Sequence, residues 1–457
     1  MAALSERKID IVRTLVQSAP DKVVGGLQKA LASAAGDPQL ARVLVLVEAE
    51  ARDRLLRNLV LKPLVPLCHG DGRDPNRLSF PALALAHVWR GVKATASRVV
   101  NDVTENLEEI LAGNHPTDSL NALAGAAAAG MRRGGHPDFQ LAAEICEQAR
   151  PGSAVVFTTC LELTPVMRGV IARATHWIGH MDNDTAAAAR VAYNDATEIA
   201  EEAGKPFFEM LAAQLPQPWM VLRLISAVMD KPNERYMADS ELAGFGERVI
   251  AEIDAGLAKL AAFDPQAGAE AAREMGKVVD LATRQMVEIE EYIDLNREHG
   301  WGKQVHMQRA ALASAVERRL READHAVTAV LPTHMGKGNK SRRQTPNLAA
   351  PPEPLAASRA LNLLVFVEAV RTSVNSGGFA AARVKTIEKL TAQIDQYLDD
   401  VLDDLRAGEV AQPANAKAML GILADFTAPL RDQKSADIIR RRAAAAFNPD
   451  GSAVLAR

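Results

Sequence analysis

The 457-residue chain has few cysteines, few aromatic residues and almost no excess of charge of either sign. Three cysteines, Cys68, Cys146 and Cys160, are too few and too widely spaced for the disulfide framework of a small secreted domain, and they favour a reducing compartment. Aromatic residues make up only 4% of the chain, which disfavours a large sheet because strands prefer aromatic and β-branched residues. A formal net charge of −4 excludes an overall polycation that coats nucleic acid or anionic lipid.

Long hydrophobic runs are also missing. No stretch approaches the roughly 18 uncharged apolar residues that a membrane-spanning helix needs. The N-terminal residues become charged at Glu6, without the preceding apolar segment of a secretory signal. The sequence therefore predicts no membrane span and a cytoplasmic location.

What the chain does have is alanine-rich sequence with the periodicity of amphipathic helices. Ile9, Val12 and Val16 follow three- and four-residue steps, and similar stripes recur along most of the chain. Capping residues and glycines mark where helices begin and end, and Ser79 and Gly113 bracket one long predicted helix. We predict an all-α fold, either a multi-helix bundle or an irregular helical array with several long amphipathic helices.

The predicted organisation has a main helical region, a linker and a smaller C-terminal helical region. Residues 1–331 form the main region, with further boundaries near 63–80 and 230–240, where prolines and glycines interrupt the helical pattern. Residues 332–354 form a proline-rich basic linker, and residues 355–457 form the C-terminal region. A faint similarity at a spacing of about 145 residues leaves open whether one helical unit is repeated or amphipathic helices merely share short strings.

The predicted linker holds five prolines and four basic residues but almost nothing apolar to bury. It therefore cannot offset an ordering entropy of roughly 1–2 kcal/mol per residue, and we expect it to be mobile. Its basic side chains are candidates for contact with an acidic partner and for early cleavage by trypsin: Lys337, Lys340, Arg342 and Arg343.

His176 and His180 are the strongest candidates for a metal site. A spacing of four residues puts both imidazoles on one face of a helix, and Asp182 or Asp184 could add an oxygen ligand. However, the glutamate of the His-Glu-x-x-His zinc motif is missing. Asp184 and Thr185 could instead cap a new helix, which would leave both histidines in the last turn of the preceding one. We therefore predict histidines that are packed or lie in the C-terminal turn of a helix, no bound metal and no cofactor.

Three further groups of residues indicate chemistry only weakly. Glu322 and His325 have the spacing of half a di-iron site in a helical bundle, but a second Glu-x-x-His is missing. The aspartates within 399–404 resemble the magnesium-binding segment of helical prenyl-diphosphate enzymes, but without a second acidic cluster we interpret them as the solvated face of an amphipathic helix. Cys68 beside His69 could be a nucleophile, although adjacent side chains often point apart.

The sequence does not support nucleotide or nucleic-acid binding. Gly336-Lys-Gly-Asn-Lys-Ser lacks the spacing of a phosphate loop. The basic run Arg440–Arg442, like the linker, has no interleaved aromatic residues to stack on bases.

These observations favour a non-catalytic helical scaffold or adaptor that acts through protein–protein contacts or self-association. Long amphipathic helices, such as those predicted over 79–113 and 377–408, could offer grooves to a partner or pair between subunits. The alternative is a helical-bundle enzyme whose site is assembled from distant histidine, aspartate and glutamate residues, and the sequence assigns no catalytic residue to it.

Overall fold

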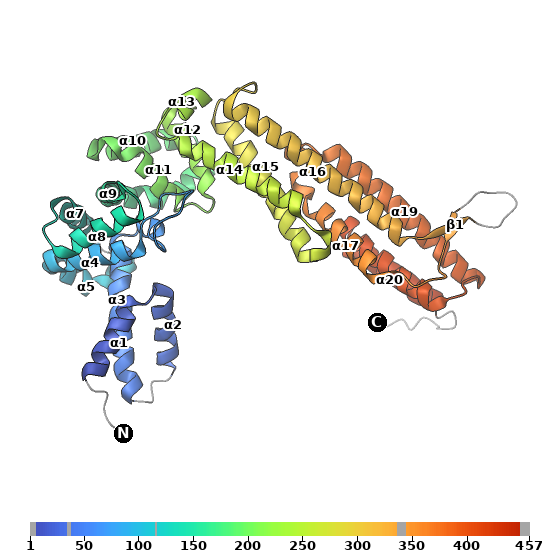
Figure 1. The fold of residues 1–457 in the computed structure, drawn as a ribbon, viewed down its shortest axis with the longest axis horizontal. Coiled ribbons are helices and arrows are strands. Elements are labelled where there is room, and N and C mark those ends of the chain that lie inside the picture. The colour runs from blue at the N-terminus through green and yellow to red at the C-terminus, as the bar shows by residue number, and fades with distance from the viewer. Residues whose placement is uncertain (1–5, 34–37, 115–116, 336–343, 448–457) are drawn as a thin grey trace. The chain divides into compact units, whose positions relative to one another are not determined.

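The computed structural model describes residues 6–33, 38–114, 117–335 and 344–447 (Figure 1). Within these residues it contains 21 α-helices, short 3₁₀ turns and one two-stranded sheet, and the structure is 80% helical. The predicted all-α fold is confirmed.

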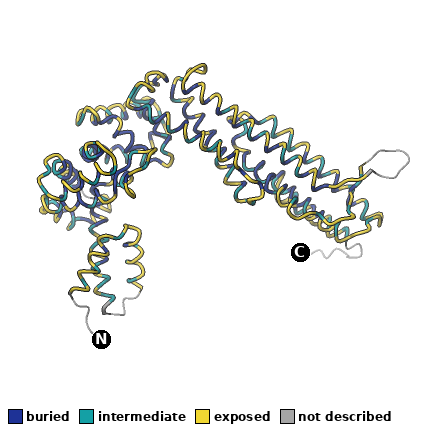
Figure 2. The backbone as a smooth tube through the Cα atoms, in the orientation of Figure 1, coloured by how far each residue is buried: buried dark blue, intermediate teal, exposed yellow. Residues whose placement is uncertain are grey.

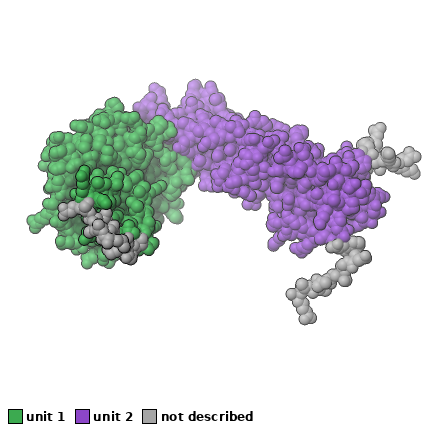
Figure 3. All heavy atoms as spheres, turned by 60° about the horizontal axis from the view of Figure 1, so that its bottom comes forward, with its two compact units in different colours: residues 1–231 green, residues 232–457 purple. Residues whose placement is uncertain are grey.

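The chain divides into two compact units, Met1–Lys231 and Pro232–Arg457 (Figure 3). The division falls in the 230–240 region, where the helical pattern of the sequence is interrupted. The region near 63–80 does not separate two units, because it lies inside unit 1. The segment 332–354 does not separate two units either, because it lies inside unit 2.

The described residues of unit 1 form twelve α-helices. They are α1 (Glu6–Ser18), α2 (Asp21–Ala32), α3 (Pro38–Val60), α4 (Ala82–Thr95), α5 (Ser97–Glu105), α6 (Leu107–Leu111), α7 (Asp118–Arg133), α8 (Pro137–Ala149), α9 (Ser153–Gly179), α10 (Asn183–Ile199), α11 (Gly204–Ala212) and α12 (Val221–Met229).

Helix α9 is the central helix of unit 1 and packs against α7, α8, α10 and α11. Among the described helices it alone is long and apolar enough to cross a membrane, and 50% of its most apolar window is buried inside the unit. Glu162 of this helix pairs with Arg132 of α7. Arg168 donates hydrogen bonds to the carbonyl oxygens of Leu59 and Val60, at the end of α3. These contacts are those of a core helix, and the absence of a membrane span stays a prediction.

The single long helix predicted over 79–113 is wrong, because α4, α5 and α6 share this stretch. The backbone leaves helical geometry at Ala96, with φ −126° and ψ 34°, and again at Asn106, with φ −95° and ψ 12°. The side-chain amide of Asn106 donates to the carbonyl oxygen of Asp102 over 3.0 Å, and such local bonds compete with the helical pattern. The shorter helices bury separate side chains, including Val103 of α5 and Leu107 of α6.

Phe139 of α8 shows how closely the helices of unit 1 approach. Its buried ring lies against Gly91 of α4 and Gly130 of α7, and a Cβ added at Gly91 would lie 2.7 Å from the ring. The interior is close-packed, so both positions need glycine for this approach.

The described residues of unit 2 form nine α-helices and the sheet. They are α13 (Glu234–Ala238), α14 (Ala243–Ala262), α15 (Ala269–Tyr292), α16 (Gly300–Val330), β1 (Thr333–Met335), β2 (Gln344–Pro346), α17 (Pro354–Ala369), α18 (Val374–Gly377), α19 (Ala380–Ala407), α20 (Pro413–Leu430) and α21 (Gln433–Phe447). Helix α19 ends at Gly408 in the left-handed conformation, as the glycine in the sequence indicates.

The segments before and after 332–354 share one hydrophobic core. Val327 and Val330 of α16 belong to the same buried cluster as Leu364 of α17 and Leu420 of α20. Helices α16 and α17 therefore belong to one compact unit, whereas the sequence predicts a linker between two helical regions here.

The described part of the predicted linker is docked on unit 2. Strands β1 and β2 pair antiparallel, with Thr333 opposite Pro346. The hydroxyl of Tyr397 donates to the carbonyl oxygen of Pro332, and the amide of Asn415 donates to that of Leu348, each over 3.0 Å. The expectation that all of 332–354 is mobile is therefore wrong for these residues.

Candidate functional site

His176 and His180 lie at the exposed end of α9. His176 is in the last turn and His180 caps the helix, and their rings stack with centroids 5.3 Å apart. Asp184 is exposed in the first turn of α10, but the helix is capped by Asp182, which exchanges hydrogen bonds with Thr185. No group of three His, Cys, Asp or Glu side chains suited to a metal occurs in the described residues.

Glu322 is held by two arginines rather than by His325. It accepts hydrogen bonds from Arg319 at 2.8 Å and from Arg359 of α17 at 2.5 Å. Burial raises its pKa, but the two guanidinium groups outweigh this effect and the pKa of Glu322 lies below its usual value. His325 is exposed. The pair therefore joins α16 to α17 and does not form half of a metal site.

The aspartates of α19 and the basic run of α21 partly neutralise each other. Asp399 pairs with Arg442 at 2.8 Å, and Arg440 pairs with Asp425 of α20 at 2.8 Å. Burial and the neighbouring carboxylates raise the pKa of Asp404. These ion pairs hold α19, α20 and α21 together, and a magnesium ion or a phosphate group at these side chains would have to compete with them.

Cys68 and His69 differ in their surroundings. Cys68 is half-buried, whereas His69 is exposed. Burial, followed by the nearby Cys146 and Cys160, raises the pKa of the Cys68 thiol well above its usual value. A thiol with a raised pKa is a poor nucleophile, because the thiolate is the reactive form. The fold thus collects all three cysteines in one region of the core, although they are far apart in the sequence.

The four basic candidates of the predicted linker, Lys337, Lys340, Arg342 and Arg343, lie outside the described residues. Their proposed contact with an acidic partner stays a prediction.

Sequence reasoning missed a cluster around Asp138 at the start of α8. Oδ1 of Asp138 lies 2.8 Å from Nδ1 of His87 and 3.5 Å from Nε of Arg90, both on α4. His136 approaches Oδ2 at 3.6 Å. In the described residues, the side-chain contacts of His87 are to Asp138 and Arg90, with no hydroxyl or thiol that the imidazole could activate. The cluster joins two helices, and only the pairing of α4 with α8 brings it together.

The N-terminal three-helix region, α1–α3, has a very small core. The hydrophobic cluster that joins the three helices has three buried residues, Val16, Val24 and Val47, one from each helix. Five partly buried residues pack against them: Val12, Ala19, Leu31, Val43 and Ala51. Figure 2 shows mostly exposed residues along α1 and α2. Three helices of this length usually each bury a continuous apolar stripe. In this region, part of the apolar surface is exposed instead.

Large apolar side chains are exposed on the α1–α2 hairpin, which we call the N-terminal hairpin. On α1, Ile11 and Leu15 are 53% and 62% exposed. On α2, Val23 and Leu27 are 47% and 39% exposed. Within each helix the two residues are four apart in the sequence, so they form an exposed stripe next to the side of the helix that is buried. We call these four residues the apolar stripes.

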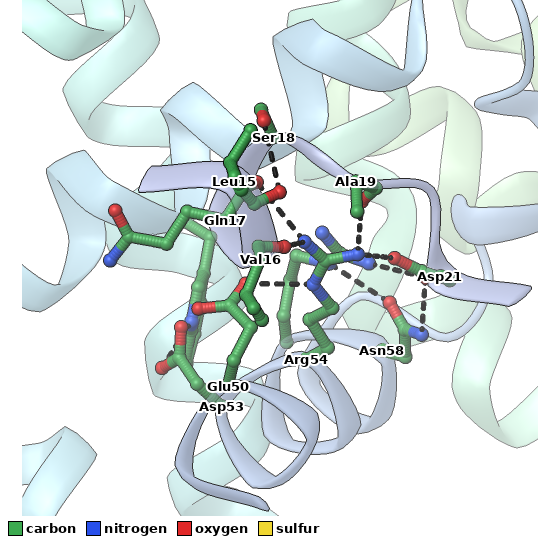
Figure 4. A network of polar contacts seen from close by, with 12 residues as sticks. Leu15, Val16, Gln17, Ser18, Ala19, Asp21, Glu50, Asp53, Arg54 and Asn58 are labelled. Carbon is green, nitrogen blue, oxygen red and sulfur yellow. Dashed lines mark hydrogen bonds and ion pairs between the residues drawn. The ribbon is translucent and has the colours of Figure 1, made fainter. Parts of the chain in front are cut away.

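A buried arginine of α3 holds the turn of the N-terminal hairpin in place (Figure 4). Arg54 donates to the carbonyl oxygens of Val16, Gln17 and Ala19 over 3.0, 3.1 and 2.7 Å. It also pairs with Asp21 at 2.8 Å. These bonds satisfy carbonyl groups at the end of α1 that lack helical partners. The turn is therefore anchored by polar contacts while the stripes stay uncovered.

The free charge of the N-terminal hairpin is positive. Residues 6–32 contain five basic and three acidic residues. Asp10 pairs with Arg13, and Asp21 pairs with Arg54 and Arg57. The remaining cations are exposed and form no ion pair with any residue in the described ranges: Arg7, Lys8, Lys22 and Lys29.

No protein-family model matches this chain, and comparison with curated proteins and with solved structures found no match. A function for this chain can therefore be proposed only from the surface of its own structure.

Proposed function

We propose that this chain is a non-catalytic cytoplasmic adaptor that binds another protein through the N-terminal hairpin. The observation that carries the proposal is the contrast between the small hydrophobic cluster that joins α1–α3, with three fully buried side chains, and the four exposed apolar side chains on α1 and α2. Exposed apolar surface rimmed by polar residues is typical of protein-binding faces. A partner helix that covers the apolar stripes would complete the small core.

The contacts of the candidate catalytic residues also support an adaptor. Glu322 and Asp399 are tied to arginines of neighbouring helices. Cys68 is a thiol with a raised pKa. These groups serve the fold in the described part of the chain, so an enzymatic role would need other residues.

Affinity purification from the native cell with mass spectrometry tests the proposal. The bait is the full chain, compared with the double variant Leu15→Ser, Leu27→Ser. The matched control is Val155→Ser, Val191→Ser, which changes two side chains of α9 and α10 that are 61% and 58% exposed. We expect a protein that co-purifies with the wild type and the control but not with the stripe variant, and that binds directly when purified separately.

Recovery of the same proteins with all three baits would contradict an adaptor role for the N-terminal hairpin. A small molecule that co-purifies in stoichiometric amount and is consumed by the chain would favour the enzyme instead.

A further inference from the structure

We infer that the partner presents an acidic amphipathic helix, which lies along the apolar stripes of the N-terminal hairpin. This inference rests on the proposed function and names the chemistry of the partner. It follows from the charges that remain unpaired around the stripes and from the kind of apolar residue within them.

Among the described side chains of α1 and α2, the unpaired charges have one sign. Arg7 and Lys8 lie on α1, and Lys22 and Lys29 lie on α2, all exposed and without an ion-pair partner in the described ranges. The two described carboxylates of the hairpin are already bound to arginines. A partner that covers the stripes would therefore meet cations, and carboxylates at its edges would complement them.

The helical positions place cations beside the stripe of α1. Lys8 is three residues before Ile11, and Arg7 is four residues before it, so both are neighbours of the stripe on the helix surface. On α2, Lys22 is one residue before Val23 and Lys29 is two residues after Leu27, spacings that place both lysines on other sides of the helix. An apolar ridge flanked by cations fits a helix with an apolar seam flanked by acids, which is how paired helices choose partners.

The composition of the hairpin favours a protein helix over a lipid surface. Its exposed apolar side chains are Ile, Leu and Val, the residues that pack in helix–helix seams. Residues 6–60 contain no tryptophan, tyrosine or phenylalanine, the side chains that anchor surface helices at the headgroup level. We therefore choose a protein helix, and a lipid surface becomes an outcome of the test.

The test uses two designed peptides and the full-length chain. The first peptide is a cross-linked helix of about 15 residues, long enough to cover α1 at roughly 1.5 Å per residue. It carries leucine at alternating three- and four-residue steps and glutamate on both flanks. The second peptide has lysine in place of every glutamate. Binding of each is followed by fluorescence anisotropy at low and physiological salt.

We expect the acidic peptide to bind at least about tenfold more tightly than the basic one, because several exposed charge pairs add a few tenths of a kcal/mol each. Raising the salt should weaken its binding, since exposed charges are screened. The double variants Arg7→Glu, Lys8→Glu and Leu15→Ser, Leu27→Ser should each bind the acidic peptide about tenfold or more weakly than the wild type does. The control Lys62→Glu, Lys205→Glu reverses two exposed lysines outside the hairpin and should bind as the wild type does.

Equal binding of the two peptides, or binding unaffected by the hairpin variants, would overturn the inference. Sedimentation of the chain with vesicles of phosphatidylcholine and phosphatidylserine, but no peptide binding, would overturn it in favour of a lipid surface. If neither peptide binds while affinity purification still yields a partner that depends on Leu15 and Leu27, the adaptor role stands and the acidic helix is wrong. Circular dichroism and hydrogen exchange of each variant show whether the hairpin is still folded.

Discussion

Arg319 of α16 donates a hydrogen bond of 2.6 Å to the carbonyl oxygen of Phe263, the residue that ends α14. The same guanidinium lies 5.4 Å from the centre of the Phe263 ring. It also donates to the carbonyl oxygens of Leu260 and Ala261 over 3.4 and 3.3 Å. One side chain thus caps the end of a neighbouring helix, where carbonyl groups lack helical donors and the helix dipole favours a cation.

Capping by an arginine from another helix recurs in both units. Arg54 caps α1 and Arg168 caps α3. Arg223 of α12 donates to Ile178 near the end of α9 over 2.8 Å. Burial lowers the pKa of Arg168, yet the planar fork of arginine suits two carbonyl groups at once. These contacts replace the side-chain caps that many of the helices lack.

Replacement of Arg319 by methionine should lower the free energy of unfolding by about 2–3 kcal/mol, because charged hydrogen bonds to buried carbonyl groups are lost. The Arg319→Lys variant should lose less free energy of unfolding, since an ammonium group keeps the charge but not the planar geometry of the guanidinium group. The control is Arg321→Met, at a 64% exposed arginine of the same helix, which should change the stability by less than about 0.5 kcal/mol. Urea denaturation followed by circular dichroism measures all three, and equal losses for Arg319→Met and Arg321→Met would contradict the cap.

Asp21 should make the anchoring of the N-terminal hairpin sensitive to acid. Burial raises its pKa, but Arg57, Asn58 and Arg54 together outweigh burial, so the pKa of Asp21 lies below its usual value. A lowered pKa means that the ionised carboxylate stabilises the folded state above the ordinary pKa of about 3.9, and that this contribution is lost as the pH falls through the lower folded value. The side chain is half exposed, so the contribution should be no more than about 1 kcal/mol.

The Asp21→Asn variant tests this linkage. The difference in hydrogen-exchange protection of α1 between wild type and variant, corrected for intrinsic rates, should be largest near neutral pH. It should shrink towards zero below about pH 4. A difference that is constant over this range would mean that the charge of Asp21 does not anchor the hairpin.

Gly276 of α15 should resist replacement by alanine. A Cβ at this position would overlap the side chain of Ala369 of α17 and lie 3.1 Å from its backbone carbonyl. Although alanine favours helix by about 1 kcal/mol, the overlap should make Gly276→Ala destabilising by roughly 1–3 kcal/mol. Gly421→Ala in α20 is the matched control, because nothing lies within 4 Å of its added Cβ, and it should stabilise the chain. Thermal unfolding of the two variants should shift in opposite directions.

All three cysteines should be inert in the folded chain. Burial raises the pKa of Cys146 to about 12, and it raises the pKa values of Cys68 and Cys160 as well. At pH 8 the thiolate fraction is then far below that of an unfolded thiol, whose pKa is about 8.5. Labelling with an aromatic disulfide reagent should therefore be at least about 100-fold slower in buffer than in denaturant. Rapid labelling of Cys68 in the folded chain would restore the nucleophile hypothesis.

The exposure of the apolar stripes could not be predicted from the sequence. The helical periodicity of the N-terminal hairpin is visible in the sequence, but a stripe of Leu15 and Ile11 looks there like any core-facing stripe. Only the packing of α1 on α3 through Val16 reveals that the other stripe is left uncovered. Likewise, Arg442 and Asp399 were separate candidates until the fold paired them.

The sequence alone determined the helical class of the chain and many of its helix boundaries, because periodicity and glycine caps act within one or two turns. Gly408 ends α19 for this reason. The tertiary structure decided the break of 79–113 into three helices and which of the boundaries predicted from the sequence divides the chain, the one near 230–240 and not those near 63–80 or 332–354. These depend on which helices share a buried core, and such contacts join residues far apart in the chain, so no local pattern of residues contains them.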